Sequence, residues 1–114
     1  MIKNKKIDWD NLGFDVIETR SMYEATFNSS GKWESRGLKP YGNISLSPAS
    51  AVLNYGQGVF EGTKSFMSSK GQAVFFRLKD NARRFAASSK RLCIPEISTD
   101  FFIDADIDRG SGEI

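Results

Sequence analysis

The chain has 114 residues, of which 39% are hydrophobic, 12% aromatic and 26% charged. These fractions are close to globular averages, so they exclude a disordered or fibrous protein, and the length predicts one domain with a modest core. Sixteen basic residues against fourteen acidic ones give a net charge of +2, which is too small to indicate nucleic acid or a charged membrane surface as the main partner.

The numbers of cysteine and histidine residues bear on disulfide formation and on metal binding. Cys93 is the single cysteine and histidine is absent, so we expect neither an internal disulfide nor a zinc site. The basic start, residues 1–6, leads into no apolar run, and this predicts a cytoplasmic protein. No stretch approaches the roughly 18 to 20 apolar residues that cross a bilayer, and we therefore expect no membrane partner.

The first half of the chain predicts one hairpin and one further strand. Residues 16–27 are rich in strand formers, and Asn28 to Gly31 supply the small polar residues that reverse a chain. Trp33 then opens the returning strand. Residues 43–46 alternate polar with apolar side chains before Pro48, which predicts a short, half-buried strand.

The second half predicts another hairpin and then a helix. Two extended runs, residues 59–66 and 72–78, flank the polar loop from Ser68 to Gly71. Asp80 follows as a candidate N-cap. Small and apolar residues then recur at a spacing of three to four, which predicts a helix over residues 81–92.

The end of the chain predicts a second helix that stops early. Pro95 ends the preceding helix, and Ser98 or Thr99 is expected to cap the next one. Residues 106–114 are polar and contain glycine without periodicity, so we expect a divergent, disordered tail there. The fold class is therefore expected to be α+β over residues 1–105, an antiparallel sheet with one or two packed helices.

A basic cluster lies on the predicted helix. It consists of Arg83, Arg84, Lys90 and Arg91, and Arg84 shares a face with Arg91. The ordinary interpretation is a solvated basic face, because exposed arginine is common. The functional alternative is a phosphate clamp, since a guanidinium fork matches phosphate oxygens bidentately.

The segment from Tyr55 to Gly62 holds three glycines among aromatic residues. A strand is expected after these glycines, so the segment is not a dinucleotide-binding loop. Tyr55 and Phe60 have an ordinary interpretation as core aromatics. Glu61 and Lys64 point to opposite faces of an extended segment, which argues against a catalytic pair. No lysine lies in an apolar run of the kind that activates a nucleophile, and we predict no catalytic residue.

Several short motifs follow one another at a characteristic spacing. They are Ile7–Phe14, Pro40–Pro48, Leu53–Gly62, Phe76–Arg77, Asn81–Phe85 and Arg91–Pro95. Together they resemble the branched-chain amino-acid aminotransferases, and look most like the eukaryotic type. The resemblance covers about Ile7 to Ala105 and implies the N-terminal small domain of a fold type IV enzyme that uses pyridoxal 5'-phosphate.

The resemblance also implies an activity and site residues. The family transfers the amino group of leucine, isoleucine or valine to 2-oxoglutarate, usually as a homodimer. Its phosphate-binding arginine falls at Arg84. Its substrate-pocket tyrosine and phenylalanine fall at Tyr55 and Phe60, and an N-terminal pocket phenylalanine falls at Phe14. Because Arg84, Tyr55 and Phe60 each lie inside a matched motif, the resemblance outweighs their ordinary interpretations.

In that family a second, larger domain carries the lysine that holds the cofactor, and we expect this catalytic domain to be absent from the 114 residues. The chain alone is then not expected to transaminate. Two interpretations stay open: an aminotransferase represented by its N-terminal domain, and a non-catalytic truncated remnant that binds through a dimer interface. Nucleic-acid binding by the basic helix ranks last, because no recognised module accompanies the charge.

Overall fold

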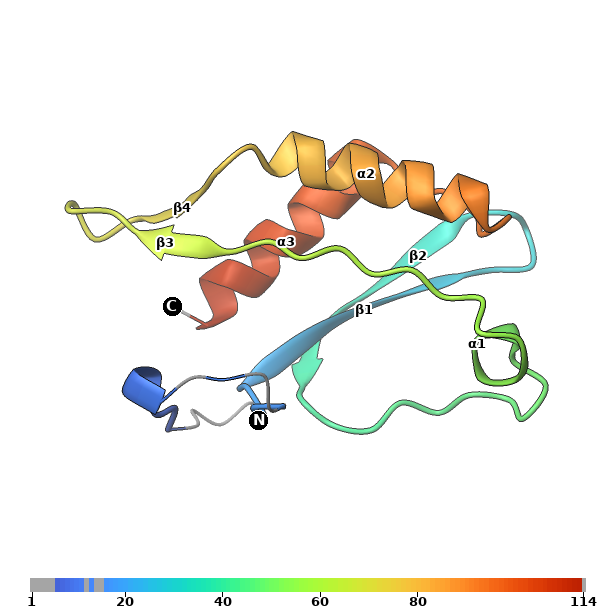
Figure 1. Ribbon diagram of the computed structural model, residues 1–114, viewed down its shortest axis with the longest axis horizontal. Helices are drawn as coiled ribbons and strands as arrows, with labels where there is room; N and C mark the ends of the chain where they lie inside the picture. Colours follow the sequence, from blue (N-terminus) through green and yellow to red (C-terminus); the bar gives the residue numbers. More distant parts are fainter. Residues whose placement is uncertain (1–5, 12, 14–15, 114) are drawn as a thin grey trace.

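The computed structural model describes residues 6–11, 13 and 16–113, which form a mixed α+β arrangement (Figure 1). In chain order the elements are η1 (Trp9–Asn11), β1 (Ser21–Phe27), β2 (Trp33–Pro40), α1 (Ala51–Asn54), β3 (Ser65–Met67), β4 (Ala73–Phe75), α2 (Leu78–Arg91) and α3 (Thr99–Glu113). The α+β class is confirmed at this level. The described strands fall into two separate antiparallel pairs, β1–β2 and β3–β4, where the sequence predicted one sheet.

The first hairpin forms around an asparagine-centred turn. The Asn28 side-chain oxygen accepts hydrogen bonds from the backbone N–H groups of Ser30 and Lys32, each at 3.0 Å. Gly31 has a φ of +83°, a backbone conformation that glycine adopts without a steric penalty. The hairpin prediction is confirmed, although β1 begins at Ser21 and not at Val16.

The strand predicted at residues 43–46 is wrong. This segment is exposed coil, and the Ile44 and Leu46 side chains are 59% and 49% exposed. Alternation of polar and apolar residues gives a strand only where a neighbouring strand takes up its hydrogen bonds. Among the described strands, none pairs with this segment.

The second hairpin is confirmed but is shorter than predicted. The strands β3 and β4 pair through three residues each, with Ser65 opposite Phe75 and Met67 opposite Ala73. Backbone N–H of Ser68 donates to the carbonyl of Gln72 at 2.8 Å and closes the turn. The rest of the two extended runs lies outside the ladder, since Phe66 and Val74 remain 56% and 42% exposed and provide little burial to extend it.

Helix α2 begins three residues before the predicted start, so the prediction of Asp80 as N-cap is wrong. Arg77 occupies the N-cap position with a left-handed φ of 53° and makes no side-chain cap hydrogen bond. Asp80 lies inside the first turn, where its carboxylate pairs with Arg77 at 2.6 Å and with Arg83 at 3.7 Å. A carboxylate there still stabilises the helix, because it faces the positive end of the helix dipole.

Helix α2 ends in a Schellman motif. Cys93 has a φ of 57°, and its N–H donates to the Lys90 carbonyl at 3.2 Å. The N–H of Ile94 donates to the Ser89 carbonyl at 2.9 Å. These two bonds satisfy carbonyls that a helix end leaves without partners, and they confirm the predicted end before Pro95.

Helix α3 confirms its predicted cap and corrects its predicted end. The Ser98 hydroxyl oxygen accepts from the backbone N–H of Phe101 at 3.1 Å. The helix then continues to Glu113, where the sequence predicted a tail without regular structure from residue 106. Once a helix has nucleated, each further residue adds one hydrogen bond, so weak periodicity alone does not end it.

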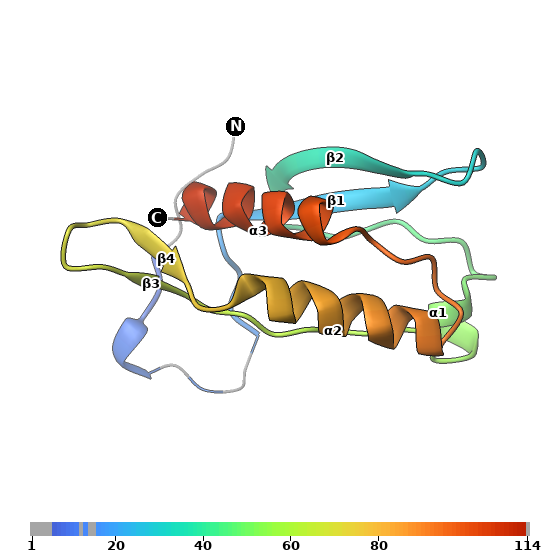
Figure 2. The same ribbon diagram turned by 90° about the horizontal axis from the view of Figure 1, so that it is seen from above.

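Packing places α3 between the first hairpin and α2 (Figure 2). Phe101 meets Tyr23 of β1 edge-on, with ring centroids 6.4 Å apart, and Phe102 meets Phe85 of α2 at 5.3 Å. The buried apolar core among the described residues is small and consists of Leu78 and Ala82. None of the described helices is both long enough and apolar enough to cross a membrane.

Candidate functional site

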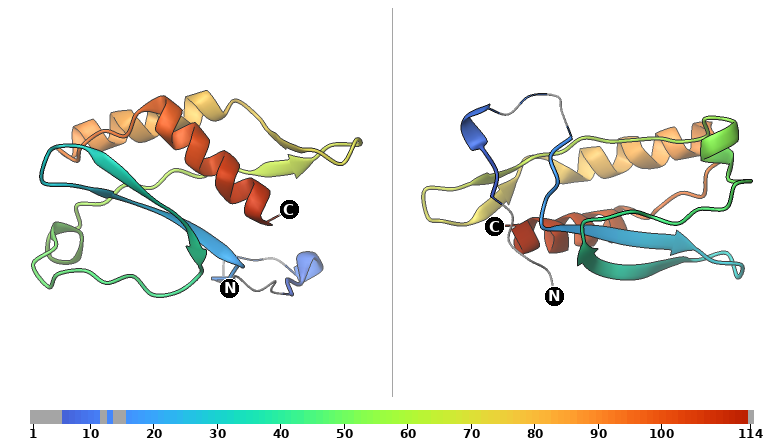
Figure 3. Two further views of the ribbon diagram at one scale, coloured as in Figure 1. Left: turned by 180° about the vertical axis from the view of Figure 1, so that it is seen from behind. Right: turned by 90° about the horizontal axis from the view of Figure 1, so that it is seen from below.

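An extended segment, residues 57–64, runs along helix α2 and is tied to it near both ends (Figures 1 and 3). At one end Gln57 donates from Nε2 to the backbone oxygen of Leu92 at 2.7 Å. At the other end Asn81 donates from Nδ2 to the backbone oxygen of Gly62 at 2.8 Å and to Oε1 of Glu61 at 3.0 Å. The two ties fix the segment on the helix.

Burial alternates along this segment with a period of two. Gln57 is partly buried, and so are Val59, Glu61 and Thr63, while the residues between them are exposed. This is the alternation of an extended chain. It confirms that Glu61 and Lys64 face opposite sides.

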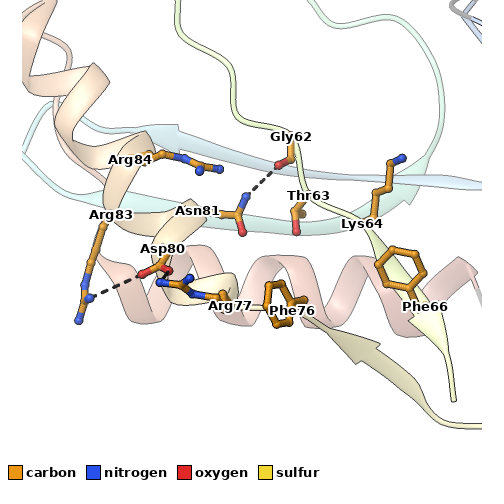
Figure 4. Close-up of a pocket in the computed structure, with 10 residues that line it drawn as sticks. All are labelled: Gly62, Thr63, Lys64, Phe66, Phe76, Arg77, Asp80, Asn81, Arg83 and Arg84. Carbon is orange, nitrogen blue, oxygen red and sulfur yellow. Dashed lines mark hydrogen bonds and ion pairs between the residues drawn. The ribbon is translucent and has the colours of Figure 1, made fainter.

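A groove of about 920 Å³ opens where this segment meets the start of α2 and the second hairpin (Figure 4). Its lining consists of Gly62, Thr63, Lys64, Phe66, Phe76, Arg77, Asp80, Asn81, Arg83 and Arg84. Four of these side chains are cationic and one is a carboxylate. The N-terminus of α2 adds its partial positive charge, so the groove favours an anion.

Most of the positive charge in the groove is already paired. Arg77 and Arg83 share the Asp80 carboxylate, which lies between them in Figure 4. Arg84 pairs instead with Glu61, whose Oε2 accepts from Nε at 3.4 Å while Oε1 accepts from Nη2. This pair joins the extended segment to the helix a third time.

The Glu61–Arg84 pair changes the titration of both groups. The hydrogen bond from Arg84 is the main cause that lowers the pKa of the Glu61 carboxyl, and the bond from Asn81 lowers it further. The hydrogen bond to Glu61 is likewise the main cause that raises the pKa of Arg84. Arg84 therefore stays a cation, and Glu61 stays an anion, across the physiological pH range.

The structure brings one of the predicted site residues to the groove. Arg84 lines it, and its side chain is 64% exposed. Tyr55 and Phe60 do not line it, and they are 86% and 90% exposed. Their ordinary interpretation as core aromatics is therefore wrong. Phe14 lies outside the described residues.

Three further polar residues, which the sequence did not indicate, hold the extended segment on α2. Gln57 and Glu61 lie in one matched motif and Asn81 begins another, so the motifs that carry the resemblance contact each other. No pattern in the sequence indicated these three residues, because only the structure shows that Asn81 is buried, at 8% exposed, and a buried amide needs hydrogen-bond partners.

The described part of the chain has no cluster of three or more histidine, cysteine, aspartate or glutamate side chains arranged to hold a metal ion. The groove itself is lined by three guanidinium groups, a lysine, a carboxylate and two phenylalanine rings, together with Thr63 and Asn81.

Comparison with known proteins gives mainly branched-chain amino-acid aminotransferases, together with a fungal transaminase, htyB of Aspergillus rugulosus. No protein-family model matches the chain. The chain is 44% identical over 99 residues to branched-chain amino acid aminotransferase 1, mitochondrial, of Humulus lupulus, which covers 87% of this chain and 25% of the relative. It is 41% identical over 101 residues to the branched-chain-amino-acid aminotransferase of Helicobacter pylori, which covers 89% of this chain and 29% of the relative. It is 40% identical over 98 residues to branched-chain-amino-acid aminotransferase 1, mitochondrial, of Arabidopsis thaliana, which covers 86% of this chain and 26% of the relative.

The chain thus spans about a quarter of the length of the curated relatives that it matches. The matched length is nevertheless nearly all of the chain, and it includes the segment and the helix that line the groove. Over most of its 114 residues, this chain is homologous to the branched-chain amino-acid aminotransferases.

Proposed function

We propose that residues 1–105 are the N-terminal small domain of a branched-chain amino-acid aminotransferase. The complete protein would transfer the amino group of leucine, isoleucine or valine to 2-oxoglutarate and would act as a homodimer. The observation that carries this proposal is the identity of about 40% over nearly the whole chain. The groove supports it, because the two matched motifs that contribute Glu61 and Arg84 meet there.

The groove residues fit a phosphorylated aromatic cofactor such as pyridoxal 5'-phosphate. Arg84 offers an exposed guanidinium to the same groove that the N-terminus of α2 lines, and both favour a phosphate group. The rings of Phe66 and Phe76 add apolar surface to the same groove. When bound, the cofactor supplies an electron sink for amino-group chemistry, while this chain holds and orients its phosphate.

Tyr55 and Phe60 are proposed to form part of the substrate pocket, with Phe14 as a further wall. An exposed ring such as Phe60 gives a rigid apolar surface, and burying a branched aliphatic substrate against it gains about 25 cal/mol per Å². The Tyr55 hydroxyl can donate a hydrogen bond to the polar end of the substrate. Because both rings face solvent in this chain, the other walls of the pocket must come from elsewhere in the protein.

A second candidate is a non-catalytic remnant that binds through a dimer interface. The exposed apolar side chains favour it, since the core is small and large residues stay in water. The most exposed of these among the described residues are Phe60, Tyr55, Val16, Phe76 and Trp9. Such a surface marks a protein interface more often than a free face.

The mass and the activity of the endogenous protein separate the two candidates. An antibody against residues 54–64 would capture it, and the intact mass would be compared with the 12.7 kDa of this chain. A much heavier protein that forms glutamate from leucine and 2-oxoglutarate supports the aminotransferase. A protein of 12.7 kDa without turnover supports the remnant.

Two controls complete that experiment. The 114 residues alone should form no glutamate, because we expect the lysine that holds the cofactor to lie in the large domain. Cell fractionation before capture would test the expected cytoplasmic location, since several relatives carry mitochondrial or chloroplastic in their names. Recovery in an organelle fraction would overturn that expectation.

A further inference from the structure

The Glu61 carboxylate occupies one edge of the Arg84 guanidinium. Its two oxygens accept from Nε and from Nη2 of Arg84. A guanidinium is planar and presents two edges, one formed by Nε with Nη2 and the other by Nη1 with Nη2. Glu61 takes the first edge, so the second can meet another planar or tetrahedral acceptor without displacing it.

The carboxylate is the fixed partner of this pair. The Glu61 side chain is 12% exposed, whereas that of Arg84 is 64% exposed. Asn81 also donates to Oε1 of Glu61, and this asparagine is itself buried and bonded to the Gly62 carbonyl. A free arginine side chain has many rotamers, and a braced carboxylate restricts them before any ligand arrives.

The other arginines of the groove lack such a support. Arg77 and Arg83 share Asp80, whose side chain is 36% exposed. No side-chain hydrogen bond braces that aspartate among the described residues. Arg84 is thus the groove arginine whose acidic partner is largely shielded from solvent and held by a second residue.

We infer that Glu61 is a positioning residue for Arg84: it holds the guanidinium so that the free edge receives a phosphoryl group in the groove. This inference rests on the proposed function, because the cofactor supplies that phosphoryl group. It assigns to Glu61 a task that the resemblance did not imply.

A simple electrostatic effect has the opposite sign, and this makes the inference testable. Removing a carboxylate beside a cation raises the attraction of that cation for an anion. If Glu61 only neutralised Arg84, Glu61→Gln would therefore tighten the binding of phosphate. If Glu61 positions Arg84, the same change loosens the guanidinium and weakens binding.

The test uses the 114-residue chain with isotopically labelled arginine, and follows the Arg84 Nε–H signal by NMR during titration with inorganic phosphate and with pyridoxal phosphate. We expect Glu61→Gln to raise the Kd for both ligands about three- to tenfold, because the Arg84 side chain must then become ordered when the ligand binds. Glu61→Asp should also raise the Kd. The aspartate variant keeps the negative charge and shortens the side chain. It therefore tests the positioning effect apart from the charge effect, even if the glutamine variant unfolds.

Two matched variants serve as controls. Gln57→Ala loosens the same segment at its other end without contacting Arg84, and it should leave the Kd unchanged. Asp80→Asn removes a carboxylate from the same groove and should tighten binding, which calibrates the electrostatic effect. An equal loss of affinity in the Gln57 and Glu61 variants would reduce the role of Glu61 to general stabilisation and overturn the inference.

The remaining outcomes distinguish the inference from the proposed function. An Arg84 signal that shifts in the wild type, with a Kd that Glu61→Gln and Glu61→Asp leave unchanged or lower, overturns the inference alone. An Arg84 signal that shifts with neither ligand in the folded wild type contradicts the proposed cofactor contact, and the inference falls with it.

Discussion

Gln57 and Leu92 lie 35 residues apart in the chain, and a hydrogen bond of 2.7 Å joins the side chain of the first to the backbone oxygen of the second. The last carbonyl groups of a helix have no partner inside the helix. Gln57 supplies one for the C-cap residue Leu92, so this bond adds to the Schellman motif at the end of α2 and anchors the segment that carries Phe60.

Gln57→Ala should destabilise the chain by about 1 kcal/mol, the usual net contribution of one hydrogen bond. Urea unfolding followed by circular dichroism would show a lower midpoint with an unchanged slope. Gln72→Ala is the matched control, because Gln72 lies in the exposed turn of the second hairpin. Equal effects of the two substitutions would show that the bond to Leu92 contributes nothing.

Glu61 should make stability depend on pH in the acid range. Its pKa in the folded chain is lowered from the ordinary value of 4.5, mainly by the hydrogen bond from Arg84. The unfolded state therefore binds more protons, and stability rises with pH. The contribution is fully present above the unfolded pKa and is lost as pH falls through the folded one.

Unfolding midpoints of the wild type and of Glu61→Gln, measured between neutral and acid pH, check this expectation. The difference between the two proteins should be constant above the unfolded pKa and should shrink below it. A difference that stays the same throughout would mean that the carboxylate charge is irrelevant to the pair.

Asp106 should destabilise the folded chain at neutral pH. Its Oδ2 is buried without a hydrogen-bond partner among the described residues, and burial raises the pKa of the carboxyl. The folded state then binds more protons than the unfolded one, so stability falls as pH rises through the unfolded pKa toward the folded pKa.

Asp106→Ala should therefore stabilise the chain by about 1 kcal/mol at neutral pH, since a buried polar atom without a partner costs this much or more. The gain should shrink in acid. Asp104→Ala, at an exposed position on the same helix, is the control for helix propensity. Destabilisation by Asp106→Ala with no effect of Asp104→Ala would contradict the assignment.

Replacing Cys93 with glycine should stabilise the folded chain. The left-handed φ of 57° at Cys93 closes the Schellman motif, and a residue with a Cβ pays a steric cost in that region. Cys93→Gly should raise the free energy of unfolding by about 0.5 to 1 kcal/mol. Thermal unfolding would measure it, and Cys93→Ala should be nearly neutral because the Cβ remains.

The elements that the sequence predicted are those that local chemistry determines. The turn at Asn28 and the cap at Ser98 each depend on hydrogen bonds within a few residues. The periodicity of α2 likewise lies in one stretch of chain. The helix begins earlier than predicted, because Arg77 and not Asp80 occupies the N-cap position. Arginine is not one of the residues that usually cap a helix through their side chains, so nothing in the sequence indicated this start.

The parts that could not be predicted depend on contacts between distant segments. The strand expected at residues 43–46 needed a partner that the described strands do not provide. Arg84 was identified through a resemblance, while its partner Glu61 lies 23 residues away and was not. The strands form two separate sheets, and the groove lies between the extended segment and α2. Both features depend on how distant parts of the chain pack together.

The two ties between the extended segment and α2 also set its register. Val59 lines a second, open pocket of about 510 Å³ between the first hairpin and helices α2 and α3, while its neighbour Phe60 is 90% exposed. A slip of one residue would reverse every side chain of the segment, bury Phe60 and turn Val59 to solvent. Gln57 and Asn81 thus decide which of two adjacent apolar residues the protein presents to other molecules, although neither contacts them itself.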